Sequence, residues 1–220
     1  MKDHPLQTVT EGTQTFHLAK VNDNHLHYDF DQLWAYFECK GKSLFHPNFT
    51  LHESDKSLLL QLCAYFLNDQ QLCATFKLDL NKGILLTGPV GCGKTSFMKL
   101  LSTITTKKKT FDLIPARNIA FEFSNQGFSV IEKYGNHKSF CFDDLGVEPN
   151  GKHFGAECNV IGEVLLSRYD LFVNHKVKTH ATTNLNAEEL EDRYGNRLRS
   201  RMRAMFNLVG IESNAKDKRI

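Results

Sequence analysis

The stretch that decides the fold is ILLTGPVGCGKTS, residues 84–96, in which a strand-like apolar run stops at glycines. The spacing from Gly88 to Thr95 is G-x-x-x-x-G-K-T, and a helix-compatible run, FMKLLSTIT, follows. Glycines let backbone N–H groups approach phosphate oxygens without a Cβ in the way, and a helix start adds further N–H groups. Lys94 can reach the β- and γ-phosphates, while the Thr95 hydroxyl suits Mg²⁺. The stretch therefore predicts a site for a nucleoside triphosphate. The residues expected to contact the nucleotide are Gly88, Pro89, Val90, Gly91, Cys92, Gly93, Lys94, Thr95 and Ser96.

The composition sets limits on the class of protein. With 220 residues, 41% of them hydrophobic, the chain can bury one substantial core and a small appendage. No apolar run approaches the length of a membrane span, and the first residues, MKDHPLQTVTEGTQ, contain neither an apolar signal core nor a cleavage site. We therefore expect a cytoplasmic protein without a membrane partner.

The net charge of +2 means that any contact with nucleic acid must come from a local patch. The lysines that could form one are Lys107, Lys108 and Lys109, and Lys176 with Lys178. The run of three also suits the end of a helix, where cations interact favourably with the helix dipole.

The cysteines and histidines do not form metal-binding patterns. Six cysteines lie far apart, none in a C-x-x-C arrangement, and we expect them to be reduced, small core residues. His25 and His27 would share one face of a strand, but no third ligand accompanies them.

From residue 82 onward, short apolar runs alternate with helical patterns. The expected strands are ILLTG, RNIAFEFS, SFCFDD, VKTHATTN and FNLVGIE. The expected helices follow Lys94 and cover FSVIEKYG, residues 156–173 and residues 187–205. Five strands interleaved with helices predict an α/β fold in three layers, with a parallel sheet and helices on both faces. Ligands of such sheets bind beyond the carboxyl ends of the strands, where the glycine loop falls.

The first part of the chain does not show the alternation of strand and helix patterns that begins at residue 82. It contains two helical patterns, DQLWAYFECKGK and HESDKSLLLQLCAYFLND. Ser54 can cap the second helix, whose apolar face comprises Leu59, Leu62, Cys63 and Phe66. We expect residues 1–50 to be a small, mostly helical extension, either a partner-binding arm or a packing element, and residues 51–220 to be the core.

Two carboxylates supply the second half of the expected site. In SFCFDDLG, Asp143 and Asp144 follow three apolar residues at the end of a strand. Asp143 would hold Mg²⁺, through water, and Asp144 would orient or deprotonate an attacking water. The alternative is a turn after a buried strand, where aspartate is common.

Another strand, THATTN, ends in Thr183 and Asn184. An amide at this edge can donate to a γ-phosphate or hold the lytic water, and it can equally close the strand as an Asx-turn. Spacing alone leaves both open.

The helical segment expected at residues 187–205 carries four arginines after Gly195. Leu198, Met202 and Met205 form one apolar stripe on it. Two rows of arginines flank this stripe: Arg197 with Arg201, and Arg199 with Arg203. One row could reach the phosphate of a neighbouring subunit, or both rows could simply be solvated.

Together these motifs resemble the AAA+ ATPases of the DnaC and IstB type, a branch of the ASCE class of P-loop NTPases. GPVGCGKT is similar to Walker A, FDDLGVE to Walker B, ATTNL to the sensor-1 strand and YGNRLRSRMR to the arginine-finger helix, and the likeness spans residues 83–219. It implies ATP and Mg²⁺ as cofactors and ATP hydrolysis as the activity. It also implies that Asn184 is sensor 1, that Arg201, with Arg197 second, is the trans-acting finger, and that Arg219 is sensor 2.

The resemblance also implies how the protein assembles, which partners it acts on and in which cellular process. Such proteins self-associate on ATP and act on single-stranded DNA or a replicative helicase in DNA replication. The alternative is an ATP switch that selects targets for a mobile element and whose partner is a transposase; a small-molecule kinase is disfavoured because no arginine-rich lid segment follows. The chain departs from the family in carrying Asp144 where many members have glutamate, in having little or no C-terminal lid, and in showing no match to the helicase-binding region of DnaC.

Overall fold

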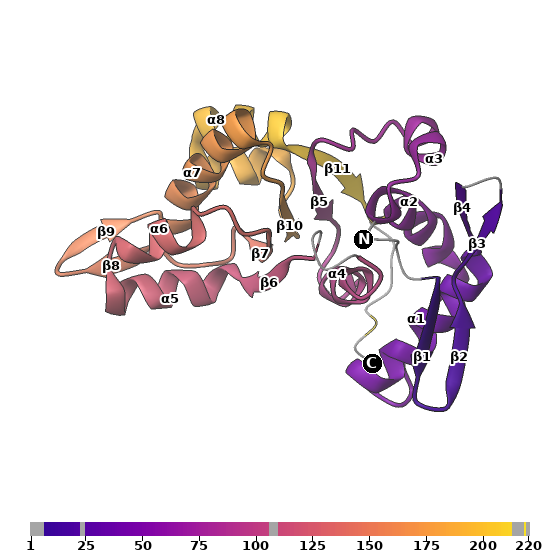
Figure 1. Ribbon diagram of the computed structural model, residues 1–220. Helices are drawn as coiled ribbons and strands as arrows, with labels where there is room; N and C mark the ends of the chain where they lie inside the picture. Colours follow the sequence, from indigo (N-terminus) through magenta and orange to yellow (C-terminus); the bar gives the residue numbers. More distant parts are fainter. Residues whose placement is uncertain (1–6, 23–24, 106–109, 213–217, 219–220) are drawn as a thin grey trace. The chain divides into compact units, whose positions relative to one another are not determined.

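The computed structural model describes residues 7–22, 25–105, 110–212 and 218 (Figure 1). Packing divides the chain into two units, residues 1–78 with 96–110 and residues 79–95 with 111–220. The expected functional boundary at residue 50 stays a prediction. No helix among the described residues is long and apolar enough to cross a membrane.

The first unit contains, in chain order, β1 (Thr8–Glu11), β2 (Gln14–His17), β3 (Ala19–Asn22), β4 (His25–Tyr28), α1 (Phe30–Leu44), the 3-10 helix η1 (Glu53–Asp55), α2 (Lys56–Leu67), α3 (Gln70–Thr75) and all but the first two residues of α4 (Lys94–Ser102). The expectation of a mostly helical extension was wrong, because two antiparallel hairpins, β1–β2 and β3–β4, precede α1. Threonine and valine favour strands, and Gly12, at φ 60°, makes the tight turn of the first hairpin.

The helices of this unit pack through the expected apolar residues. Asp29 caps α1 by accepting the N–H groups of Asp31 and Gln32. The apolar face predicted for α2 is confirmed, since its four residues are buried. The predicted cap was wrong: Ser54 lies within η1, and it is the Asp55 carboxylate that accepts the His52 N–H, at 3.0 Å.

The second unit is built on a sheet. Its elements are β5 (Gly83–Thr87), the first two residues of α4, β6 (Asp112–Pro115), α5 (Ala116–Gln126), α6 (Ser129–Tyr134), β7 (Phe140–Leu145), β8 (Gly151–His153), β9 (Ala156–Cys158), α7 (Val160–His175), β10 (Thr179–Thr183), α8 (Ala187–Met205) and β11 (Phe206–Gly210).

Five of these strands form one parallel sheet in the order β11-β5-β10-β7-β6. Ala181 of β10 lies opposite Leu85 of β5 on one side and Phe142 of β7 on the other. The strand before the glycine loop, β5, and the strand of the two aspartates, β7, are thus separated by β10, so three loops meet at one edge of the sheet. The α/β class and the five parallel strands are confirmed.

One expected strand was wrong. RNIAFEFS lies in α5, and the strand is the preceding Asp112–Pro115. Ile119, Phe121 and Phe123 alternate as in a strand, but the buried set is Ala116, Ile119, Ala120 and Phe123, which is helical spacing. The helix expected from residue 156 begins instead at Val160, after the β8–β9 hairpin.

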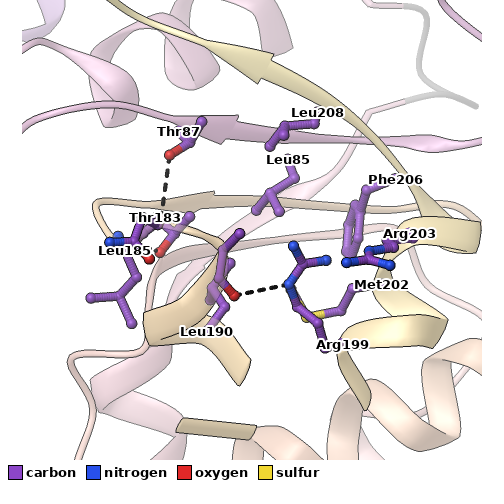
Figure 2. A pocket seen from close by; sticks show the side chains of 12 residues that line it. Leu85, Thr87, Thr183, Leu185, Leu190, Arg199, Met202, Arg203, Phe206 and Leu208 are labelled. Carbon is purple, nitrogen blue, oxygen red and sulfur yellow. Dashed lines mark hydrogen bonds between the residues drawn. The ribbon is translucent and has the colours of Figure 1, made fainter. Parts of the chain in front are cut away.

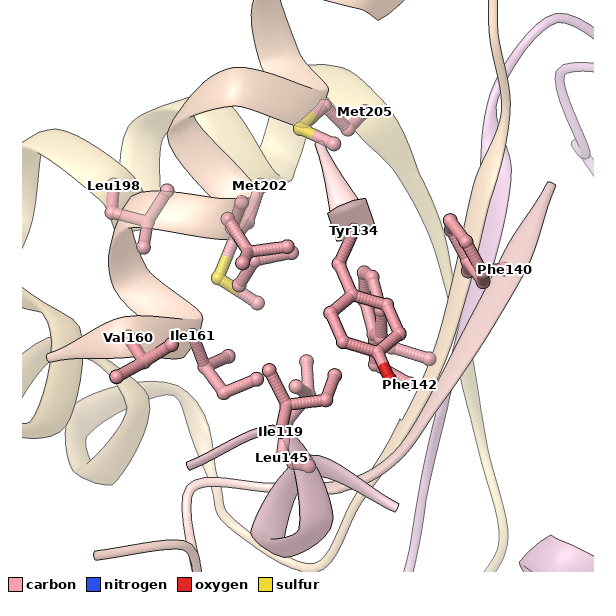
Figure 3. Close-up of a cluster of buried hydrophobic side chains, with 14 of the residues drawn as sticks. Ile119, Tyr134, Phe140, Phe142, Leu145, Val160, Ile161, Leu198, Met202 and Met205 are labelled. Carbon is pink, nitrogen blue, oxygen red and sulfur yellow. The ribbon is translucent and has the colours of Figure 1, made fainter. Parts of the chain in front are cut away.

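Helices α5, α6, α7 and α8 cover one face of the sheet (Figure 3). Phe140 and Phe142 of β7 meet Tyr134 of α6, with ring centroids 5.5 Å and 6.4 Å apart. The side chain of Arg168, on α7, is completely buried. It donates hydrogen bonds to Thr179 Oγ1 and to three backbone carbonyls near the amino ends of β7 and β10. Burial lowers the pKa of Arg168 to about 10. This side chain therefore ties the ends of two strands together on the side away from the glycine loop.

Candidate functional site

The glycine loop joins β5 to the first residues of α4. Gly91 and Gly93 have φ values of 80° and 96°, which other residues rarely adopt. A Cβ on Gly88 would lie 2.8 Å from the Cβ of Ile211, so this position needs glycine for a close approach. The loop has the backbone conformations that a phosphate-binding loop requires.

Lys94 is held inside this loop. Its side chain is buried, and Nζ donates to the carbonyls of Gly88 and Pro89, both at 2.9 Å. The ammonium group therefore lies inside the loop, from where it can neutralise the charge of a phosphate bound there.

Thr95 and Asp143 meet directly. The Thr95 hydroxyl lies 3.0 Å and 2.9 Å from the two oxygens of the Asp143 carboxylate. Asp143 is buried and also accepts a hydrogen bond of 2.6 Å from the Thr182 hydroxyl. A hydroxyl and a carboxylate side by side are hard oxygen ligands, so these two residues fit Mg²⁺ bound together with water and phosphate oxygens.

A β-bulge arranges the two aspartates. Ala181 pairs with Phe142 but Thr183 pairs with Leu145, so Asp143 and Asp144 together face Thr182. Asp144 has a φ of 56°, and its N–H donates to Thr182 Oγ1 at 2.9 Å. In a regular strand, successive side chains point to opposite faces; here the irregular backbone gives one buried carboxylate and one exposed at the same edge.

The sequence analysis missed Thr182. This fully buried hydroxyl donates to one aspartate and accepts from the backbone of the next. Its only signal was the position of TTN at the end of a strand beside the strand of the aspartates.

Asn184 lies at the carboxyl end of β10. Its Oδ1 atom is buried and has no hydrogen-bond partner among the described residues. The sequence left open an Asx-turn by Asn184, but the strand is closed instead by an ST-turn of Thr183, whose hydroxyl accepts the Leu185 N–H at 3.0 Å and donates to the Leu145 carbonyl at 2.8 Å. A buried acceptor without a partner at this edge indicates that a water or another hydrogen-bond donor occupies the position next to Asn184.

The arginine helix is interrupted. Gly195, at φ 81° and ψ 156°, divides α8 into two helical pieces. The predicted apolar stripe is confirmed, because Leu198, Met202 and Met205 are buried.

The two arginine rows have different surroundings. In one row Arg197 is exposed and the Arg201 guanidinium lies 4.8 Å from the centroid of Tyr169. In the other row, Arg199 donates to the Ala187 carbonyl at 3.0 Å and lines, with Arg203, an apolar pocket of about 270 Å³ (Figure 2). The roles of Arg197 and Arg201 stay predictions, and Arg219 lies outside the described residues.

A buried carboxylate that sequence reasoning did not single out connects the aspartate loop to α8. Glu148 accepts the Gly146 N–H at 2.7 Å and the Tyr194 hydroxyl at 2.7 Å, and Arg193 donates to its backbone carbonyl at 2.9 Å. Burial and the neighbouring Glu148 raise the pKa of Tyr194, so its hydroxyl stays a donor. The signal was the glutamate in FDDLGVE and the RY pair before Gly195.

The other sequence candidates are less informative. All six cysteines are free, and four of them, Cys63, Cys73, Cys92 and Cys141, are buried as expected. Among the described side chains, no three His, Cys, Asp or Glu residues gather to hold a metal ion. Lys176 ends α7, and Lys178 precedes β10, so both lie at the amino ends of strands. The run Lys107, Lys108 and Lys109 lies outside the described residues.

No family model and no curated protein matches the chain. Solved structures do match it. The crystal structure of the DnaC helicase loader is 17% identical, with a TM-score of 0.52 over 76% of this chain and 94% of that one. The crystal structure of DnaI is also 17% identical, with a TM-score of 0.53 over 76% of this chain and 89% of that one.

The chain shares its fold with the DnaC helicase loader and with DnaI. A third structure, the replication initiator DnaA bound to AMPPCP and single-stranded DNA, is 18% identical, with a TM-score of 0.50 over 78% of this chain and 50% of that one. At such identities the likeness establishes the shared fold, while the chemistry must be argued from the residues of this chain.

Proposed function

We propose that this protein is a Mg²⁺-dependent ATPase that hydrolyses ATP to ADP and phosphate. The contact of Thr95 with Asp143, beside the loop that holds Lys94, carries the proposal. It brings a phosphate-binding lysine and two hard oxygen ligands to one edge of the sheet. Thr95 and Asp143 would hold the metal ion, which would supply positive charge against the phosphates.

Each residue has a separate task in this proposal. The loop from Gly88 to Gly93 donates N–H groups to the phosphates, with Ser96 continuing the helix start. Asp144, exposed at the same edge, accepts a proton from the attacking water. Asn184 donates from Nδ2 to the γ-phosphate, or accepts a hydrogen bond from that water through its unsatisfied Oδ1.

We further propose that the site is completed by a second copy of the chain. Arg201, with Arg197 second, would stabilise charge on the phosphate bound by a neighbour, and Arg219 would contact the nucleotide in its own subunit. Self-association on ATP is then required for full activity, and the assembly acts on single-stranded DNA or a replicative helicase. The similarity to DnaC and DnaI favours this replication role over the alternative, an IstB-like switch that selects targets with a transposase.

The test is steady-state ATP hydrolysis measured against protein concentration. We expect specific activity to rise with concentration, and Lys94→Ala to abolish it. Mixtures of Arg201→Ala and Asp144→Asn subunits should regain activity, because the intact Asp144 site of an Arg201→Ala subunit can be completed by the intact Arg201 of an Asp144→Asn neighbour. A specific activity independent of concentration, together with mixtures no more active than their components, would refute the shared site.

The two biological roles are separated by a second assay. Stimulation of hydrolysis by a replicative helicase or by single-stranded DNA supports the replication role. Stimulation by a transposase, without response to a helicase, supports the switch.

A further inference from the structure

The exposed side chain of Phe154 contributes little to the stability of the fold. Phe154 is 98% exposed at the tip of the β8–β9 hairpin. Because His153 pairs with Ala156, Phe154 and Gly155 form a two-residue turn, and their φ values are 47° and 82°. Such turns favour asparagine or glycine at the first position, and a bulky residue there is strained. The Phe154 ring therefore buries almost no apolar surface, and the residue has a strained backbone conformation.

The Phe154 ring is part of a larger surface formed by aromatic side chains. The hairpin packs against α5 (Figure 1), and buried Phe123 of α5 contacts both His153 and Phe128, with centroids 6.0 Å and 5.5 Å away. Phe128 is itself 65% exposed, and the rings of His153 and Phe154 are 4.4 Å apart. We call the surface formed by Phe128, His153 and Phe154 the aromatic ledge.

Basic and neutral polar side chains surround the ledge, together with one carboxylate, Glu157, which is exposed on β9 opposite Lys152. Lys152 is exposed on β8, and on α5 the Arg117 guanidinium lies 5.1 Å from the centroid of Phe121, a further half-exposed ring. The segment FSNQGFSVI, residues 123–131, contains hydroxyl and amide side chains but no carboxylate. Glu122 is engaged by Lys133 at 2.6 Å, and Glu157 accepts from the Asn150 amide at 2.8 Å.

We propose that the aromatic ledge binds single-stranded nucleic acid by stacking bases on Phe154 and Phe128. Exposed rings stack on any base, and amides, hydroxyls and cations around them suit base edges and phosphates. Lys152 contacts the backbone between the stacked bases. The inference rests on the proposed function, and it identifies the surface by which the ATPase holds a strand.

The test is fluorescence anisotropy of a labelled oligothymidylate titrated with the full-length protein and a non-hydrolysable ATP analogue. Phe154→Asn removes the ring but places a preferred residue in the turn, so the hairpin is kept. We expect it to weaken binding about tenfold, the effect of losing about 1.4 kcal/mol of stacking, whereas Phe154→Tyr binds as the wild type does. Lys152→Ala should lower the salt dependence of binding, and Phe154→Asn should not. Val173→Ala, at a 45% exposed apolar position on α7, is the matched control and should change neither.

The outcomes separate the proposals. An unchanged affinity for Phe154→Asn overturns the ledge alone, since the strand is then bound elsewhere. If the wild type binds no oligonucleotide, both the ledge and the proposed action on DNA fail, while the ATPase assay still stands by itself. If Phe154→Asn abolishes self-association in sedimentation and leaves DNA binding intact, the ring docks on a protein surface and the ledge is refuted.

Discussion

We expect the hydroxyl of Thr182 to contribute both to the stability of the fold and to ATP hydrolysis. Replacing Thr182 by valine keeps the volume but removes the donor to Asp143 and leaves the N–H of Asp144 without its acceptor. A hydrogen bond to a charged group contributes roughly 1.5–3 kcal/mol, and an unsatisfied buried N–H costs roughly 1–3 kcal/mol. We therefore expect the variant to lose about 3 kcal/mol of stability, which in a chain of this size lowers Tm by roughly 6–12 °C.

The same change should affect activity more than binding of ATP. Groups that orient a metal ligand typically contribute about 10- to 100-fold to metal affinity or rate, so we expect hydrolysis at saturating ATP to fall by about that factor and to need more Mg²⁺. Thr182→Ser keeps the hydroxyl and should stay within about threefold of the wild type. Thr75→Val, at an exposed helical threonine, is the matched control. If Thr182→Val hydrolyses ATP like the wild type at every Mg²⁺ concentration, the Thr182 bond does not orient Asp143.

Three further predictions concern the fold around the site. Burial, with Lys178 and Arg168 nearby, lowers the pKa of His180 from 6.5 to about 3, so the unfolded chain binds this proton first as pH falls. Stability should then be lost below about pH 6.5, by up to about 1.4 kcal/mol per unit, and His180→Asn, which keeps an acceptor for the Ile84 N–H, should reduce that slope in chemical denaturation. Arg168→Met leaves three carbonyls without donors and should destabilise by about 3 kcal/mol or more, yet preserve ATP affinity in the folded protein, because these contacts lie at the amino ends of the strands. Gly195→Ala, where a Cβ would meet nothing but φ is 81°, should cost about 1–3 kcal/mol and lower hydrolysis in the assembled state without changing ATP binding measured by calorimetry.

Much of the fold could be predicted because the decisive signals are local. The glycine spacing, the paired aspartates and TTN each follow an apolar run, and each run ends at the same edge of the sheet. The apolar stripe of α8 was also predictable, since helical periodicity decides which side chains are buried.

Features that depend on a neighbouring element were not predictable in this way. Phe121 and Phe123 fit a strand or a helix equally, and only packing shows that Phe123 is buried while Phe121 is half exposed. The bulge at Asp143 exists because β7 carries one residue more than β10 at that point, a relation between two segments about 40 residues apart. The role of Thr182 follows from the bulge and is invisible without it.

The contacts of Glu148 suggest how the two halves of the site are coordinated. One carboxylate oxygen holds the peptide that follows the aspartates, and the other holds Tyr194, directly before the break at Gly195. The segment after that break carries Arg197 and Arg201. Both bonds end on one buried carboxylate, so a shift of the aspartate loop would also move Tyr194. Gly195 follows Tyr194 directly, and at this break the movement could become a rotation of the helical segment that carries the arginines. In the ATPase that we propose, Glu148 would join the loop of the metal ligand Asp143 to the segment of Arg197 and Arg201, so that hydrolysis in one subunit would depend on the arrangement of the next.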